Sequence, residues 1–229
     1  MAGRFPAAVF ILKMKPLADC KLYTFVDTDY LHGRAPELVA QQLCDGGSDL
    51  IQLRAKNSTP EDIRQMVKKI LPVTRRASVG LVINDHLEIA SDLGADLCHL
   101  GQEDFFAAGH VNVSDLKLKY SKLKIGLSTH APAQARGALA AGADYIAIGP
   151  VYATGTKPAA TPVTLDYVRW AAVNATVPWF AIGGINLETL DAVLAAGARR
   201  ICVVSAILNA PDIAKACLEF RRRLPDLVD

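Results

Sequence analysis

The sequence lacks features that several classes of protein need. No apolar run approaches the roughly 18 residues of a membrane-spanning helix. The net charge is only +2, with 25 Lys and Arg against 23 Asp and Glu, so there is no broad basic surface for nucleic acid. Aromatic residues are scarce at 7%, whereas hydrophobic residues reach 51%, which excludes intrinsic disorder and a fibrous repeat. We expect a globular protein with neither a membrane nor a nucleic-acid partner.

Cysteine chemistry is also sparse. The five cysteines are odd in number and form no C-x-x-C pair, and most fall in apolar strand or helix patterns. This usage is typical of reduced thiols packed in the core of a cytoplasmic protein. The absence of an H-E-x-x-H motif and of a Cys/His cluster disfavours zinc.

Residues 1–20 are interpreted as an N-terminal extension, and residues 21–229 as one domain. An apolar stretch at 5–12 is followed by Lys13 and Lys15, and Asp19 stands where a lipoprotein signal needs a small residue before Cys20. We therefore expect no export.

One pattern repeats along the rest of the chain: a short apolar run, a polar turn, an amphipathic stretch, and a Gly before the next run. The expected strands are 22–26, 50–53, 81–84, 97–100, 124–127, 145–148, 179–182 and 201–204. Their starts lie about 26 residues apart, the size of a βα unit. The sequence predicts an α/β fold, a single (β/α)₈ TIM barrel.

An open doubly wound sheet would also contain continuous apolar strands. However, no G-x-G-x-x-G motif follows the first strand, and the last two strands are followed by Gly183-Gly184 and by Ser205. Barrels often bind phosphate with the loops after strands seven and eight, which favours the barrel.

Functional residues of such barrels lie where the strands end. The second strand ends with Gln52, Arg54 and Lys56, which alternate onto one face of an extended segment. Two cations at this spacing suit a phosphate or pyrophosphate better than a pair of salt bridges, although solvated surface charge would give the same pattern.

Two carboxylates follow the third and fourth strands. Asp85 comes directly after Asn84, and Asp104 follows a short Gly-containing turn. Either could simply cap a helix. Because the two carboxylates follow neighbouring strands and lie near cations, the pair favours a site that holds Mg²⁺ together with a phosphorylated substrate.

The fifth and sixth strands lead into Ser128 and into a Gly/Pro-rich loop with Thr154, Thr156 and Lys157. The loop runs for roughly 15 residues before the next expected helix, and a loop of that length is usually functional. Ser128 with His130 could suggest a hydrolase, but two residues apart in a turn is poor geometry, and no acid orients the histidine. His99 is expected to be a hydrogen-bonded histidine of the barrel interior.

These strand ends carry a resemblance that runs from about residue 22 to 208. The motifs occur in order at nearly every strand end: Leu22-Tyr23, Gln52-Leu53-Arg54-Ala55-Lys56, Ile83-Asn84-Asp85, His99-Leu100-Gly101-Gln102-Glu103-Asp104, Gly126-Leu127-Ser128-Thr129-His130, Asp144-Tyr145 with Gly149-Pro150, Thr154-Gly155-Thr156-Lys157-Pro158 and Ala181-Ile182-Gly183-Gly184-Ile185. The sequence resembles the thiamine phosphate synthase family.

The resemblance implies a transferase of thiamine biosynthesis that joins hydroxymethylpyrimidine pyrophosphate to hydroxyethylthiazole phosphate and releases pyrophosphate with Mg²⁺. Arg54, Lys56 and Lys157 would then hold the pyrophosphate, with Ser128 beside it and the reacting carbon, while Asp85 and Asp104 would hold the metal. Gln52 and Asn84 would contact the pyrimidine. The thiazole phosphate would be bound by Thr154, Thr156, Gly184, Val204 and Ser205.

The sequence departs from the family pattern in two places that bear on the fold. Thr164 stands where a Gly is common, and the segment 105–122 is longer than usual. Two rival functions remain, a thiazole tautomerase-like paralogue and a non-catalytic barrel that binds a phosphorylated ligand. Neither needs the full set of cations and carboxylates found here. The sequence does not determine the oligomeric state, and a homo-oligomer is one of the states it allows.

Overall fold

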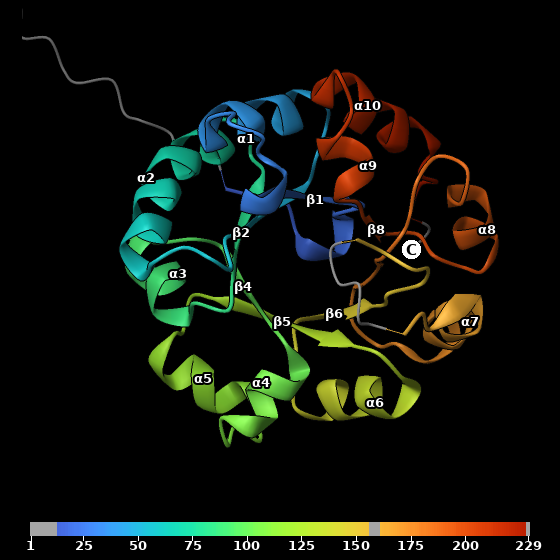
Figure 1. Ribbon diagram of the computed structural model, residues 1–229. Coiled ribbons are helices and arrows are strands. Elements are labelled where there is room, and N and C mark those ends of the chain that lie inside the picture. The colour runs from blue at the N-terminus through green and yellow to red at the C-terminus, as the bar shows by residue number, and fades with distance from the viewer. Residues whose placement is uncertain (1–12, 156–160, 228–229) are drawn as a thin grey trace, which may run out of the picture.

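The computed structural model describes residues 13–155 and 161–227. Eight parallel strands pair in sequence order, and the eighth pairs with the first to close a barrel (Figure 1). The strands are β1 (Leu22–Asp27), β2 (Leu50–Arg54), β3 (Gly80–Asn84), β4 (Leu97–Leu100), β5 (Lys124–Thr129), β6 (Tyr145–Ile148), β7 (Trp179–Ala181) and β8 (Ile201–Cys202). The predicted TIM barrel is confirmed.

Helices form a ring outside the barrel (Figure 1). They are α1 (Pro36–Asp45), α2 (Pro60–Arg76), α3 (Leu87–Leu93), α4 (Gln102–Ala107), α5 (Val113–Lys119), α6 (Pro132–Ala140), α7 (Thr164–Asn174), α8 (Leu190–Ala195), α9 (Ser205–Leu208) and α10 (Ile213–Arg223), with short 3₁₀ turns at Leu17–Asp19 and Thr28–Tyr30. The long segment 105–122 contains the second half of α4 and all of α5. In the part of the chain described, none of the helices has both the length and the apolarity to cross a bilayer.

The longest helix illustrates how local sequence sets these elements. Thr59 caps α2: the Asp62 N–H donates to Thr59 Oγ1, and the Thr59 N–H donates to Asp62 Oδ2, each at 3.2 Å. Pro60 occupies the first turn, where its missing N–H costs nothing, and Arg75 and Arg76 lie in the last turn near the negative end of the helix dipole. Both ends of α2 are therefore set by residues of its own sequence.

The strand boundaries differ from the prediction by one or two residues at the site-bearing ends. β5 continues to Thr129 because Ser128 and Thr129 still pair with Ala147 and Ile148 of β6. β8 ends at Cys202 because its ladder with β1 includes only two pairs, Leu22 with Ile201 and Tyr23 with Cys202.

The described end of the N-terminal extension packs against the barrel. Leu17 and Cys20 are buried, and Lys15 Nζ lies 2.5 Å from Asp49 Oδ1. All the cysteines are free thiols, four of them buried and Cys44 partly so, as the sequence predicted.

Candidate active site

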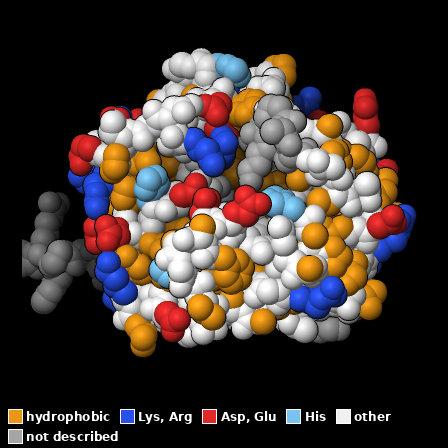
Figure 2. All heavy atoms as spheres, turned by 60° about the horizontal axis from the view of Figure 1, so that its bottom comes forward, with side chains coloured by type: hydrophobic (Ala, Val, Ile, Leu, Met, Phe, Trp, Pro, Cys, Tyr) orange, Lys and Arg blue, Asp and Glu red, His pale blue; other side chains and the backbone are white. Residues whose placement is uncertain are grey.

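One pocket at the carboxyl ends of the strands collects the residues predicted from sequence. All of those that lie in the described ranges line it: Gln52, Arg54, Lys56, Asn84, Asp85, Asp104, Ser128, Thr154, Gly184, Val204 and Ser205. Thr156 and Lys157 lie outside the described residues. Figure 2 shows acidic, basic and histidine side chains meeting near the centre of one face of the molecule.

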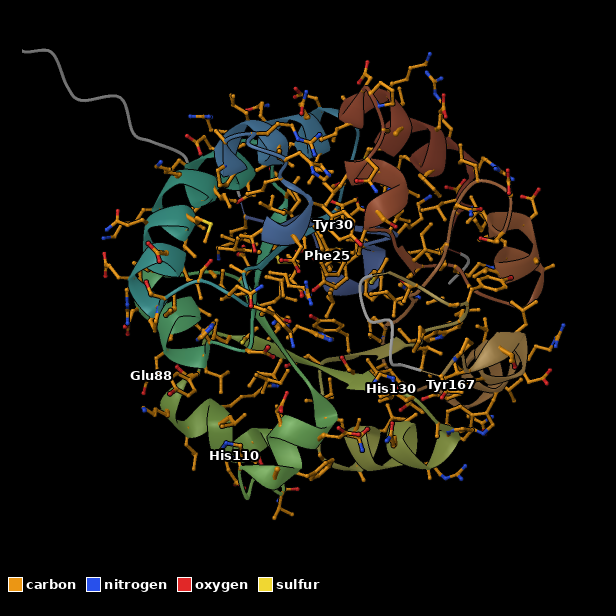
Figure 3. All side chains as sticks on the ribbon, viewed as in Figure 1. Phe25, Tyr30, Glu88, His110, His130 and Tyr167 are labelled. Atoms are coloured by element: carbon orange, nitrogen blue, oxygen red, sulfur yellow. The ribbon has the colours of Figure 1, made fainter. Side chains whose placement is uncertain are left out.

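The barrel geometry explains why residues so far apart in sequence meet. Side chains two residues apart on a strand point to the same face, so Gln52 and Arg54 of β2 both contribute to the pocket. The same alternation brings in Tyr23 and Phe25 of β1. Figure 3 shows Phe25 near the centre of the ring of strands.

Arg54 is held by two carboxylates. Its Nη1 donates to Asp27 Oδ2 at 2.8 Å and to Asp29 Oδ2 at 3.2 Å. Burial raises the pKa of the Asp27 carboxyl, and the Arg54 guanidinium partly offsets that effect. The sequence pattern favours a phosphate over a salt-bridge pair for this arginine and does not predict the ion pair. A guanidinium has five N–H donors, so donors remain for an anion.

The two candidate metal ligands follow neighbouring strands: Asp85 comes directly after β3, and Asp104 lies at the start of α4, shortly after β4. Asp85 has a φ of +63°, a conformation that Asp tolerates better than most residues. Asn84 Nδ2 donates to Asp85 Oδ2 at 2.5 Å, and Lys56 Nζ lies 4.0 Å from the same oxygen. Asp104 lies in the first turn of α4.

The donor set can be tested against the chemistry of magnesium. Among the described residues no three His, Cys, Asp or Glu side chains gather as a metal cluster. Mg²⁺ commonly takes only one or two carboxylates and completes its shell with water and substrate phosphate. Asp85 and Asp104, which share one pocket lined by cations, fit that mode of binding.

A chain of hydrogen-bonded polar side chains crosses the barrel, and four of its five members line the pocket. Gln52 Nε2 donates to Tyr23 Oη at 2.5 Å, and Tyr23 Oη lies 3.3 Å from Tyr145 Oη. Tyr145 Oη lies 3.1 Å from His99 Nδ1, and His99 Nε2 lies 2.9 Å from Ser128 Oγ. His99 is thus hydrogen-bonded in the interior, as predicted.

Ser128 therefore has a histidine neighbour, but it is not His130. The His130 ring bonds through Nδ1 to the Gly149 carbonyl, and the backbone N–H of His130 donates to Gln134 Oε1 at 2.6 Å. In Figure 3 the His130 side chain lies beside Tyr167, toward α7. The two hydrogen bonds of the His99 ring described above go to hydroxyl groups, those of Tyr145 and Ser128.

The glycine loop after β7 passes very close to the loop after β6. Gly183 and Gly184 have φ values of +100° and +63°. A Cβ on Gly184 would lie 2.6 Å from the Cβ of Tyr152 and 2.7 Å from the Ala153 carbonyl oxygen. Only glycine fits both the conformation and the space.

Sequence reasoning missed several residues of the pocket wall. Tyr23, Phe25, Pro150 and Cys202 line it, yet none was proposed for the site. The two aromatic residues could have been found from the sequence. Tyr23, Phe25 and Asp27 alternate along β1 and so share one face, and Asp27 on that face is the residue that pairs with Arg54.

Comparison with known proteins supports the resemblance seen in the motifs. The family model for thiamine monophosphate synthase matches residues 22–207. A thiamine-phosphate synthase of Thermus thermophilus is 45% identical over 78% of this chain and 84% of that protein. One from Acidothermus cellulolyticus is 41% identical over 91% and 96%.

A solved structure gives the same result. Thiamine phosphate pyrophosphorylase from Pyrococcus furiosus superposes with a TM-score of 0.79 at 29% identity, covering 90% of this chain and 96% of that chain. With this agreement of sequence, fold and pocket, the chain belongs to the thiamine monophosphate synthase family.

Proposed function

We propose that the chain joins hydroxymethylpyrimidine pyrophosphate to hydroxyethylthiazole phosphate, giving thiamine phosphate and pyrophosphate. As a family member it is a transferase of thiamine phosphate synthesis. The observation that carries the proposal is the single pocket in which Arg54 and Lys56 lie with Asp85 and Asp104. Such a set suits a pyrophosphate that departs as a metal-bound anion.

The reaction needs little covalent chemistry from the protein. The bond between the pyrimidine methylene carbon and the pyrophosphate oxygen breaks, and its electron pair leaves with the pyrophosphate. The thiazole nitrogen then supplies the pair that forms the new bond to the same carbon. Positive groups fixed beside the departing anion stabilise the charge that develops there.

We assign the residues of the pocket to two substrate regions. Arg54, Lys56 and Lys157 hold the pyrophosphate, with Ser128 beside it, and Gln52 and Asn84 contact the pyrimidine. The thiazole phosphate is bound by the residues that follow β6, β7 and β8: Thr154, Thr156, Gly184, Val204 and Ser205. This division rests on the family resemblance and, for the described residues, on their common pocket.

Asp85 and Asp104 would hold Mg²⁺. When bound, the metal supplies positive charge to the departing pyrophosphate. Asn84 holds the Asp85 carboxylate in place through the bond from Nδ2 to Oδ2 at 2.5 Å.

Three further properties belong to the proposal. We place the protein in the cytoplasm, because its cysteines are free thiols. We treat residues 21–229 as the catalytic domain and 1–20 as an N-terminal extension, whose described part includes the buried Leu17 and Cys20. The substrates are small phosphorylated molecules.

The test separates the proposed reaction from its rivals. We expect the purified chain to form thiamine phosphate and pyrophosphate in equal amounts from both substrates with Mg²⁺, and no product once EDTA has removed the metal. A tautomerase-like paralogue would instead isomerise thiazole phosphate without the pyrimidine substrate, and a binding protein would form no product. Either of those results would overturn the proposal.

A further inference from the structure

The chain of hydrogen bonds through the barrel interior joins two residues of the proposed substrate site. We call it the polar chain and define it as Gln52, Tyr23, Tyr145, His99 and Ser128. Its members come from β1, β2, β4, β5 and β6. Tyr23, Tyr145, Gln52 and His99 are at most 6% exposed. Buried polar groups of this kind must satisfy one another, so the state of one member constrains the next.

The barrel is built to accommodate the centre of the polar chain. A Cβ on Gly126 would overlap the Tyr145 ring, so glycine at this position of β5 is what lets that ring lie inside. The Tyr23 ring stacks on Phe25 with centroids 5.3 Å apart and meets Phe180 edge-on at 5.4 Å. Burial raises the pKa of both Tyr23 and Tyr145 well above the usual value, so the two phenols keep their protons and can donate.

The proton on each member can be assigned from the substrate end. A pyrophosphate oxygen only accepts, so the Ser128 hydroxyl must donate toward it. The Ser128 oxygen then accepts from His99 Nε2–H, which leaves Nδ1 to accept from the Tyr145 hydroxyl. Tyr145 in turn accepts from Tyr23.

The far end agrees with this direction. Tyr23 accepts from the Gln52 amide nitrogen, so Gln52 Oε1 remains as an acceptor. The exocyclic amine of an aminopyrimidine is a donor and needs such an oxygen. The opposite direction would offer an acceptor to the anion and a donor to the amine, which is wrong at both ends.

We propose that His99 is a positioning residue: held by Tyr145 as the Nε2–H tautomer, it fixes Ser128 as a donor to the departing pyrophosphate while the same polar chain fixes Gln52 as an acceptor for the pyrimidine amine. The inference rests on the proposed function for the identity of the two ligands. In the protein without substrate, the same direction follows from the Gln52 amide, which donates to Tyr23 and so leaves the Tyr23 hydroxyl to donate to Tyr145.

The direction can be measured without substrate. In protein labelled with ¹⁵N-histidine at pH 8, we expect the His99 ring to carry its proton on Nε2, with Nδ1 unprotonated. Tyr145→Phe removes the hydroxyl that donates to Nδ1 and should give a mixture of both tautomers. A wild-type ring protonated at Nδ1 would overturn the proposal.

Kinetics test whether the direction matters for catalysis. Tyr145→Phe should lower kcat about tenfold, the loss expected when one well-placed hydrogen bond is removed. Tyr167→Phe is the matched control: Tyr167 Oη donates to Thr129 Oγ1 at 2.7 Å, so it also loses a buried phenol hydrogen bond, but outside the polar chain. That variant should keep the wild-type kcat.

A double variant separates positioning from a general packing defect. If Tyr145 acts through His99 on Ser128, adding Tyr145→Phe to the Ser128→Ala variant should lower kcat by less than about twofold. An equal tenfold loss in both backgrounds, or a kcat for Tyr145→Phe that matches Tyr167→Phe, would contradict the proposal. Should Tyr145→Phe fail to fold, Tyr23→Phe takes its place in these measurements, because it removes the neighbouring hydrogen bond between Tyr23 and Tyr145.

The two proposals fail in different ways. If the wild-type protein forms no thiamine phosphate, the proposed function is wrong, whereas the His99 tautomer still reports the direction of the polar chain. If product forms but His99 carries its proton on Nδ1, the function stands and the inference falls.

Discussion

At the scale of single residues, the ion pair between Asp27 and Arg54 is the most consequential contact of the site. The Asp27 side chain is fully buried and that of Arg54 is only 10% exposed. A buried charge that loses its partner is costly, because the protein interior solvates it poorly. The pair therefore supports both the fold and the orientation of the arginine that faces the pocket.

We expect Asp27→Asn to lower the free energy of unfolding by about 3–5 kcal/mol, since it leaves the Arg54 charge buried with only the more distant Asp29. The matched control is Asp29→Asn, whose side chain is 47% exposed and which should cost less than about 1 kcal/mol. Chemical denaturation of both variants checks this. Equal losses would show that burial of the pair contributes nothing.

Sequence reasoning found the residues of the pocket but not this pairing. The expectation that functional residues lie where the strands of a barrel end depends only on which residues follow each apolar run. That information is local in the sequence. The contact of Asp27 with Arg54 depends on the register of β1 with β2, in which these two residues are directly paired. Nothing in the local pattern of either strand determines that register.

At the scale of elements, the start of α7 carries a conformational strain. Thr164 has a φ of +61°, in the left-handed region that a β-branched residue strongly disfavours. The family resemblance pointed to Gly as the common residue there, and the backbone explains why. The strain lies in the connection from the β6 loop to α7, not in the barrel.

Thr164→Gly should stabilise the protein by about 1 kcal/mol and raise its melting temperature by roughly 2–4 °C, because glycine adopts positive φ freely. The hydroxyl contributes little, since Asp166 N–H reaches Thr164 Oγ1 only at 3.4 Å. Thr164→Ala keeps a Cβ, so it should bring no such gain. Scanning calorimetry of the two variants tests the account, and a gain with alanine equal to that with glycine would contradict it.

Elements were predictable where the sequence pattern was strong and local. All eight strands were expected within a few residues, because parallel strands buried on both faces appear as short apolar runs. Their ends were less certain. β8 retains only Ile201–Cys202, although apolar residues continue through Val204. Pairing with the neighbouring strand decides the end, and apolar character does not.

At the scale of the whole molecule, the aliphatic composition and the cysteine usage have one explanation. A closed parallel barrel inside a ring of helices buries nearly every strand side chain (Figure 1). The thiols share that environment. Burial raises the pKa of Cys20 and of Cys44 to about 12 and that of Cys217 to about 11.

These thiols should therefore be unreactive in the folded protein. At pH 8 we expect a thiol reagent such as DTNB to label fewer than one cysteine rapidly, because thiolate is the reactive form and is scarce at that pH. All five should react once the protein is unfolded in guanidinium chloride. Rapid labelling of two or more cysteines in the native state would contradict the buried arrangement.

The account as a whole places thiamine phosphate formation in the pocket where Asp85 lies. The most direct test is the rate of product formation by the wild type and by Asp85→Asn, with both substrates and Mg²⁺. Asn tolerates the φ of +63°, so the variant should keep its fold and melting temperature. We predict product from the wild type and a rate at least about 100-fold lower for the variant. No product from folded wild-type protein, or a variant with a near wild-type rate, would contradict the account.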